Sequence, residues 1–78
     1  MNYRLKIRDL REDADMTQTE IAKILGTNQK VYSRYETEVN AIPIWHLVTL
    51  AQFYQTSTDY LLGLTDERRP YPPPRRGR

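Results

Sequence analysis

The sequence contains no cysteine and only one histidine, His46, among its 78 residues. Without thiols the chain can form neither disulfides nor thiolate zinc sites, and a single imidazole excludes most histidine-based metal sites. No apolar run approaches the length that spans a bilayer, and the first residues lack the apolar core of a signal peptide. We therefore expect a soluble protein of the reducing cytoplasm, with no metal, no cofactor and no membrane contact.

Positive charge is scarce until the end of the chain. Up to Glu67 there are seven basic residues and all ten acidic ones, a net charge of −3, whereas residues 68–78 hold five arginines and no acid, a net charge of +5. Any affinity for a polyanion must therefore come from the local placement of charge. We predict one domain over residues 1–66 and a Pro/Arg-rich, flexible tail over residues 67–78.

Five short segments carry the apolar periodicity of amphipathic helices, and none alternates like a strand. The fold class predicted is therefore all-α, a compact domain of five helices with short connections. The predicted helices cover Asn2–Ala14, Thr17 to about Leu25, Thr27 or Asn28 to about Thr37, Pro43 through Tyr54, and Asp59–Leu62.

Cap residues support these boundaries. Thr17-Gln18-Thr19-Glu20 fits a capping box, in which the threonine hydroxyl and the glutamate carboxylate each accept from a backbone amide. Gly26 and Gly63 can each end a helix in the left-handed conformation without the steric penalty of a Cβ. Ser57 or Thr58 is the predicted cap of the last helix.

The third predicted helix separates into two chemically different sides. At about 100° per residue, Tyr32 and Tyr35 point toward the core, and Val31 lies nearer to them. The opposite arc, about 140° wide, carries amide, ammonium, hydroxyl and guanidinium groups. Its members are Gln29, Lys30, Ser33 and Arg34. An ordinary solvated helix surface is the simpler interpretation, but a capped helix-Gly-helix context favours base reading in a DNA groove.

The outward groups match the chemistry of the major groove. Gln29 can pair bidentately with adenine, and Lys30 and Arg34 suit O6 and N7 of guanine. Gln18 begins the preceding helix, which would cross the DNA backbone, so we expect it to meet a phosphate.

Arg11 and Glu36 form a second predicted constellation. Arg11 lies near the core-facing edge of the first helix, and Glu36 ends the third. We predict a bidentate, partly buried ion pair that orients the third helix against the first. Two unrelated surface charges are the simpler alternative.

The fourth helix has two apolar stripes. The stripe that we predict to be buried consists of Ile44, Leu47, Val48, Ala51 and Tyr54. A second stripe holds Trp45, Thr49 and Phe53, which either pack beneath the last helix or the chain termini, or form a self-association surface. His46 lies off the apolar stripe, and we assign it no function.

The run MTQTEIAKILGTNQKVYSRYE, followed by IP and later by TDYLLGLTD, resembles the phage-repressor-like helix-turn-helix family, also called the Cro/CI or Xre type. The resemblance covers about Ile7 to Asp66. It implies a five-helix DNA-binding domain that acts as a dimer on near-palindromic operators, and it makes Arg11 and Glu36 the family's structural ion pair. We predict DNA contacts at Gln18, Asn28, Gln29, Lys30, Ser33, Arg34 and Asn40.

One segment departs from the family pattern. Many relatives carry Gly and Lys or Arg between helices three and four, where this chain has Glu38-Val39-Asn40-Ala41. Asn40 can donate to a phosphate, whereas Glu38 would repel one. The arginines of the tail could compensate by adding phosphate contacts, although a tail without a role fits the sequence equally well.

The predicted function is a sequence-specific regulator of transcription that binds double-stranded DNA at the nucleoid as a homodimeric repressor. A protein-binding role is the alternative, either as the antitoxin of a toxin–antitoxin pair or as an adaptor that does not bind DNA. We expect no enzyme and no small-molecule ligand, because the sequence offers no cysteine, one isolated histidine and no glycine-rich phosphate loop.

Overall fold

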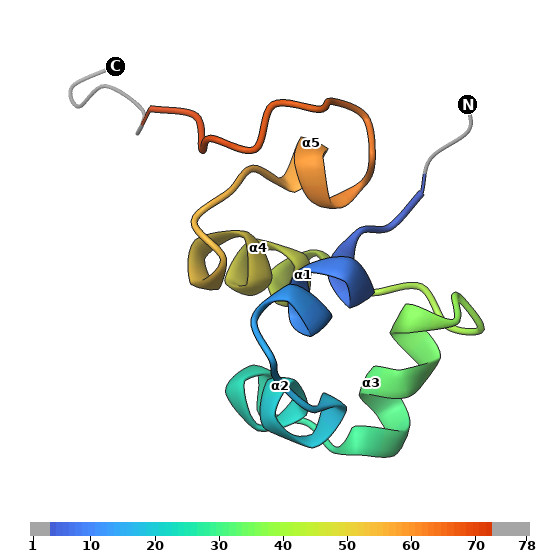
Figure 1. The fold of residues 1–78 in the computed structure, drawn as a ribbon. Coiled ribbons are helices and arrows are strands. Elements are labelled where there is room, and N and C mark those ends of the chain that lie inside the picture. Colours follow the sequence, from blue (N-terminus) through green and yellow to red (C-terminus); the bar gives the residue numbers. More distant parts are fainter. Residues whose placement is uncertain (1–3, 73–78) are drawn as a thin grey trace, which may run out of the picture.

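A computed structural model describes residues 4–72 of the chain. Within these residues the chain forms five helices and no strands, which confirms the predicted all-α class (Figure 1). The helices are α1 (Ile7–Asp13), α2 (Gln18–Leu25), α3 (Gln29–Glu36), α4 (Ile44–Phe53) and α5 (Thr58–Leu61). None of the helices in this described part is long and apolar enough to cross a membrane.

Side-chain caps begin three of the helices. The Thr17 hydroxyl accepts from the Glu20 amide at 3.1 Å, and the Glu20 carboxylate accepts from the Thr17 amide at 2.8 Å, so the predicted capping box is confirmed. At α3 the cap is Asn28 rather than Thr27, and at α5 it is Ser57. Each cap satisfies an amide that has no partner inside its helix, which fixes where the helix starts.

The prediction that the first helix begins at Asn2 is wrong in the described residues from Arg4 onward, because α1 begins at Ile7. The Arg4 and Lys6 amides donate to the carbonyls of Leu62 and Leu61, at 3.1 and 2.8 Å. These bonds hold residues 4–6 against the end of α5. The Arg4 and Lys6 amides therefore have partners without being part of a helix. Asn2 and Tyr3 lie outside the described residues.

Gly26 and Gly63 end α2 and the α5 region with the same left-handed backbone, φ +74° at each. Their surroundings differ. A Cβ added to Gly26 would meet open space, whereas one added to Gly63 would strike the Arg4 carbonyl oxygen. Gly63 is therefore required both by its own conformation and by the segment that docks on it.

One apolar core joins all five helices. Tyr32, Ile7, Ile21, Leu50 and Leu61 are its largest fully buried members. The buried phenol rings of Tyr32 and Tyr35 confirm that α3 turns these residues inward, and the two rings meet edge to face with centroids 6.3 Å apart. The core therefore fixes the rotation of α3 about its own axis.

The predicted buried stripe of α4 is wrong at two positions. Ile44 is 75% exposed and Val48 is 41% exposed, whereas Leu50, which the prediction omitted, is fully buried. Apolar residues occur all around this helix, so periodicity alone could not identify its inner side. Trp45 and Phe53 are 69% and 43% exposed, so Trp45 stays largely open within residues 4–72 and Phe53 is partly covered.

The described part of the predicted tail lies against the domain. The Thr56 hydroxyl donates to the Arg68 carbonyl at 2.5 Å, and the Tyr71 hydroxyl donates to the Asp59 carboxylate at 2.6 Å. Residues 73–78, including the last three arginines, lie outside the described residues. The division of the chain at residue 66 stays a prediction.

Candidate nucleic-acid interface

The outward side of α3 carries the side chains that the sequence selected. Gln29, Lys30 and Arg34 are exposed, and Ser33 is half-buried at the same side. Neither Lys30 nor Arg34 forms an ion pair with any residue between 4 and 72. The two cationic groups are therefore not neutralised within this part of the chain and can approach a polyanion.

Three further predicted contact residues lie at the ends of helices or in the loop after α3. The Asn28 side-chain oxygen accepts from the Val31 amide at 2.9 Å and so caps α3. Gln18 is the first residue of α2 and is half-buried. Asn40 is exposed, and its backbone amide donates to the Arg34 carbonyl at 3.1 Å, which ties the loop after α3 to the end of that helix.

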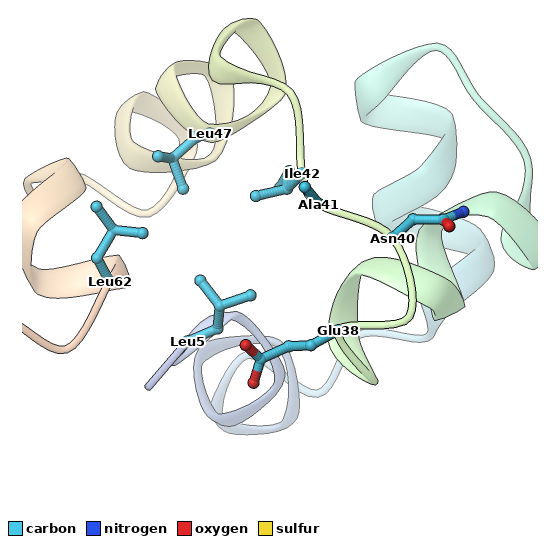
Figure 2. A pocket seen from close by; sticks show the side chains of 7 residues that line it. All are labelled: Leu5, Glu38, Asn40, Ala41, Ile42, Leu47 and Leu62. Atoms are coloured by element: carbon cyan, nitrogen blue, oxygen red, sulfur yellow. The ribbon is translucent and has the colours of Figure 1, made fainter. Parts of the chain in front are cut away.

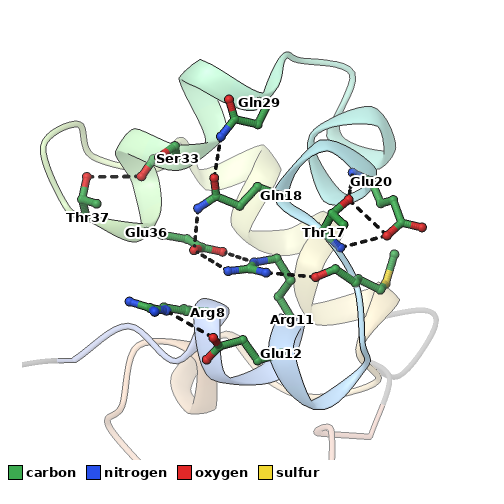
Figure 3. Close-up of polar contacts among 11 residues, drawn as sticks. Arg8, Arg11, Glu12, Thr17, Gln18, Glu20, Gln29, Ser33, Glu36 and Thr37 are labelled. Atoms are coloured by element: carbon green, nitrogen blue, oxygen red, sulfur yellow. Dashed lines mark hydrogen bonds and ion pairs between the residues drawn. The ribbon is translucent and has the colours of Figure 1, made fainter.

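A chain of side-chain hydrogen bonds connects the outward side of α3 with α2 and α1 (Figure 3). Gln29 Nε2 donates to Gln18 Oε1 at 2.6 Å, and Gln18 Nε2 donates to Glu36 Oε1 at 3.0 Å. The two amides face each other because α2 packs closely against α3. This contact uses one hydrogen of the Gln29 side-chain amide. The side-chain carbonyl oxygen and the second amide hydrogen of Gln29 stay available for a further hydrogen bond each.

Arg11 and Glu36 form the ion pair at the inner end of this hydrogen-bond chain. Arg11 Nε and Nη2 donate to Glu36 Oε2 and Oε1, at 2.7 and 3.1 Å, and Arg11 Nη1 donates to the Met16 carbonyl at 2.9 Å. The side chains are only 13% and 3% exposed. The bidentate geometry links α1, the turn before α2 and the end of α3 in one rigid arrangement.

The ionisation of Glu36 is set by two opposing effects. Burial disfavours the charged carboxylate, but the hydrogen bonds from Arg11 and Gln18 outweigh burial and lower the pKa of Glu36 below its ordinary value of 4.5. The same pairing raises the pKa of Arg11. Both groups therefore stay charged at neutral pH, and the pair persists.

The loop between α3 and α4 holds the acidic residue that departs from the family pattern. Glu38 is exposed and has a left-handed backbone, φ +61°, which is uncommon for a residue with a Cβ. A shallow hollow of about 240 Å³ lies beneath this loop (Figure 2). Leu5, Ile42, Leu47 and Leu62 supply its apolar walls, and the Asn40 side chain points away from it.

Sequence reasoning treated Gln18 and Gln29 as two independent contacts and missed their hydrogen bond. Eleven positions separate them along the chain, so no helical spacing signals the contact. It also missed the left-handed conformation of Glu38. The family pattern of a glycine somewhere between helices three and four was the one available signal, and we interpreted it only as a phosphate contact.

Comparisons with known proteins identify the family of this chain. A model of the helix-turn-helix family matches residues 7–61. The chain is 38% identical over 68 residues to YobD, an uncharacterised HTH-type transcriptional regulator of Bacillus subtilis strain 168. The matched region covers 87% of this chain but only 61% of YobD. No solved structure shows a significant match. These matches confirm the predicted family: the chain belongs to the Cro/CI, or Xre-type, helix-turn-helix proteins.

Proposed function

We propose that this chain binds double-stranded DNA in a sequence-specific manner and regulates transcription, with α3 in the major groove. The observation that carries the proposal is the division of α3 into a buried side with Tyr32 and Tyr35 and an outward side with Gln29, Lys30 and Arg34. Amide and guanidinium groups on an exposed helix are the groups that distinguish base edges in that groove. The name of YobD is consistent with a regulatory role.

Each outward residue has a defined partner in this proposal. Gln29 pairs with an adenine through its free carbonyl oxygen and remaining amide hydrogen, and Lys30 and Arg34 donate to guanine O6 and N7. The hydrogen bond to Gln18 fixes the Gln29 amide before DNA arrives, which reduces the entropy lost on binding. Ser33 lies between these residues and contacts the same groove.

Phosphate contacts come from the borders of this surface. The N-terminus of α2, at Gln18, presents unpaired amides that favour an anion, and Asn28 and Asn40 lie at the start of α3 and in the loop after it. Such contacts position the helix without reading sequence. The ion pair of Arg11 and Glu36 acts indirectly, since it holds the end of α3 against α1 and the turn before α2.

We further propose that the chain is a repressor that acts as a dimer on a near-palindromic operator. Two α3 helices related by a two-fold axis would enter successive major grooves on one side of the duplex, about 34 Å apart. Selection from a random DNA pool tests this arrangement. A palindromic consensus is the expected result, and a single unrepeated half-site would contradict it.

Mutation of Arg34 tests the reading role of α3. We expect Arg34→Ala to reduce discrimination at one base pair by about 1–3 kcal/mol, measured by titration of the selected site and its single-base variants. Arg8→Ala is the matched control, because it removes the same unit charge from an exposed residue of α1. Equal discrimination by the two variants would refute the assignment.

A protein-binding role, as an antitoxin or adaptor, is the competing proposal. The net charge of −3 up to Glu67 and the exposed carboxylate of Glu38 favour it. Gel-shift titration across a salt series separates the two roles. Binding that weakens steeply with salt supports DNA recognition, whereas no binding to any sequence supports the competing role.

A further inference from the structure

The outer face of α4 is mostly apolar and carries no charged residue. Its members lie within an arc of about 180°, opposite the buried residues of the same helix. They are Ile44, Trp45, Val48, Thr49, Gln52 and Phe53. Trp45 points almost directly away from the core and is 69% exposed. Charged residues make up 28% of the chain, so an entire uncharged helix face is unusual for a surface that only meets water.

The exposed area is large enough for a small specific interface. From their exposed fractions, Ile44, Trp45, Val48 and Phe53 together present an apolar surface on the order of 500 Å². If two copies each covered this surface, about 1,000 Å² would be buried, which is the lower limit for a specific protein–protein contact. Tryptophan and phenylalanine are also among the residues enriched at the centre of such contacts.

The chemistry of this face favours a second copy of the same chain. A two-fold axis brings each residue near its own equivalent, so any charge close to the axis would meet a like charge. The outer face has none. The Gln52 amide can donate and accept at once, which suits a symmetric contact. The Thr49 hydroxyl already donates to the Trp45 carbonyl at 2.9 Å, so it can be buried at little cost.

The same face combines a projection with a hollow. Beside Val48 and Gln52 lies a hollow of about 580 Å³, whose other side is formed by Pro70 and Tyr71. Trp45 projects one turn away on α4. A two-fold contact requires both shapes on one surface, because residue i of the first copy meets residue j of the second and the reverse.

We propose that two copies associate through the outer faces of α4, which run antiparallel across a two-fold axis near Val48 and Thr49. The axis then lies at the midpoint of α4, which runs from Ile44 to Phe53. Each residue faces the residue of the other copy that lies equally far beyond the axis, so Trp45 of each copy lies beside Gln52 and Phe53 of the other. This inference rests on the proposed function, since it supplies the symmetry that a palindromic operator needs. The face shares no residue with the outward side of α3, so both surfaces can be occupied together.

Sedimentation equilibrium of the full chain without DNA tests the interface. We expect a dimer, and we expect Trp45→Glu to raise its dissociation constant by about 30-fold or more, because it removes a central aromatic residue and buries a charge. Val39→Glu is the matched control: Val39 is 71% exposed but lies in the loop before α4. Circular dichroism verifies that both variants keep the helical content of the wild type.

Disulfide trapping gives a second, positional readout. The chain has no cysteine, so a single substitution introduces the only thiol. We expect Val48→Cys, near the proposed axis, to form a covalent dimer under mild oxidation. Lys23→Cys, on an exposed position of α2, should stay monomeric under the same conditions.

The outcomes separate this inference from the proposed function. A wild-type chain that stays monomeric yet selects a DNA sequence overturns the interface alone. A dimer whose dissociation constant is the same in Trp45→Glu and in the wild type also overturns it. Failure to select any DNA sequence, with dimerisation that depends on Trp45, overturns the proposed function and supports the interface.

Discussion

Gly26 and Gly63 permit a matched test of how the domain is held together. Both have φ +74°, so alanine at either position suffers the same left-handed strain, about 1–2 kcal/mol. They differ in what an added Cβ meets. Gly26 faces open space, whereas at Gly63 the new atom would strike the Arg4 carbonyl and lie 3.0 Å from the Arg4 nitrogen.

We therefore expect unequal costs for the same substitution. Gly26→Ala should lower the free energy of unfolding by about 1–2 kcal/mol, the strain alone. Gly63→Ala should cost about 3 kcal/mol or more, because the backbone must shift and the hydrogen bonds of Arg4 and Lys6 to α5 weaken. In a domain of this size each kcal/mol corresponds to a fall in Tm of about 4–8 °C.

Urea denaturation followed by circular dichroism measures both variants. The difference between them isolates the contact with the Arg4 backbone, because the conformational strain cancels. Equal losses of stability would refute the reasoning and would mean that the segment before α1 contributes little. The folded fraction of Gly26→Ala should bind DNA like the wild type, since the turn geometry is retained.

Two further predictions concern acidic residues of the candidate site. The lowered pKa of Glu36 means that its ion pair stabilises the fold fully above the unfolded-state pKa, and that this contribution is lost as the pH falls through the lower, folded-state value. Glu36→Gln should lower the free energy of unfolding by about 3 kcal/mol at neutral pH. Urea titrations from neutral to acidic pH should show that this free energy depends less on pH in the variant than in the wild type. An unchanged pH dependence would contradict the pairing. Glu38→Gly should raise stability by about 1 kcal/mol, because glycine tolerates φ +61°, and should strengthen DNA binding by removing a carboxylate near the phosphates. Thermal melts and gel shifts measure these effects, and Glu12→Gly, on α1, is a control for the charge change.

Local sequence predicted the elements that depend on local interactions. The capping box at Thr17 needs only residues three positions apart, and the left-handed turn at Gly26 needs only the missing Cβ. The inward rotation of Tyr32 and Tyr35 follows from helical spacing on α3, where the two sides differ clearly in polarity. These features needed no knowledge of the other helices.

Contacts between distant segments required the tertiary structure. The hydrogen bond from Gln29 to Gln18 exists because α2 packs against α3, and the start of α1 at Ile7 depends on carbonyls of α5 more than fifty positions away. The exposure of Ile44 and Val48 follows from which side of α4 the other helices cover. The sequence by itself determined where the side-chain-capped helices α2, α3 and α5 begin and which side of α3 is polar, because those follow from neighbouring residues. Only packing could decide the apolar face left open on α4, since a helix that is apolar all around carries no local mark of its inner side.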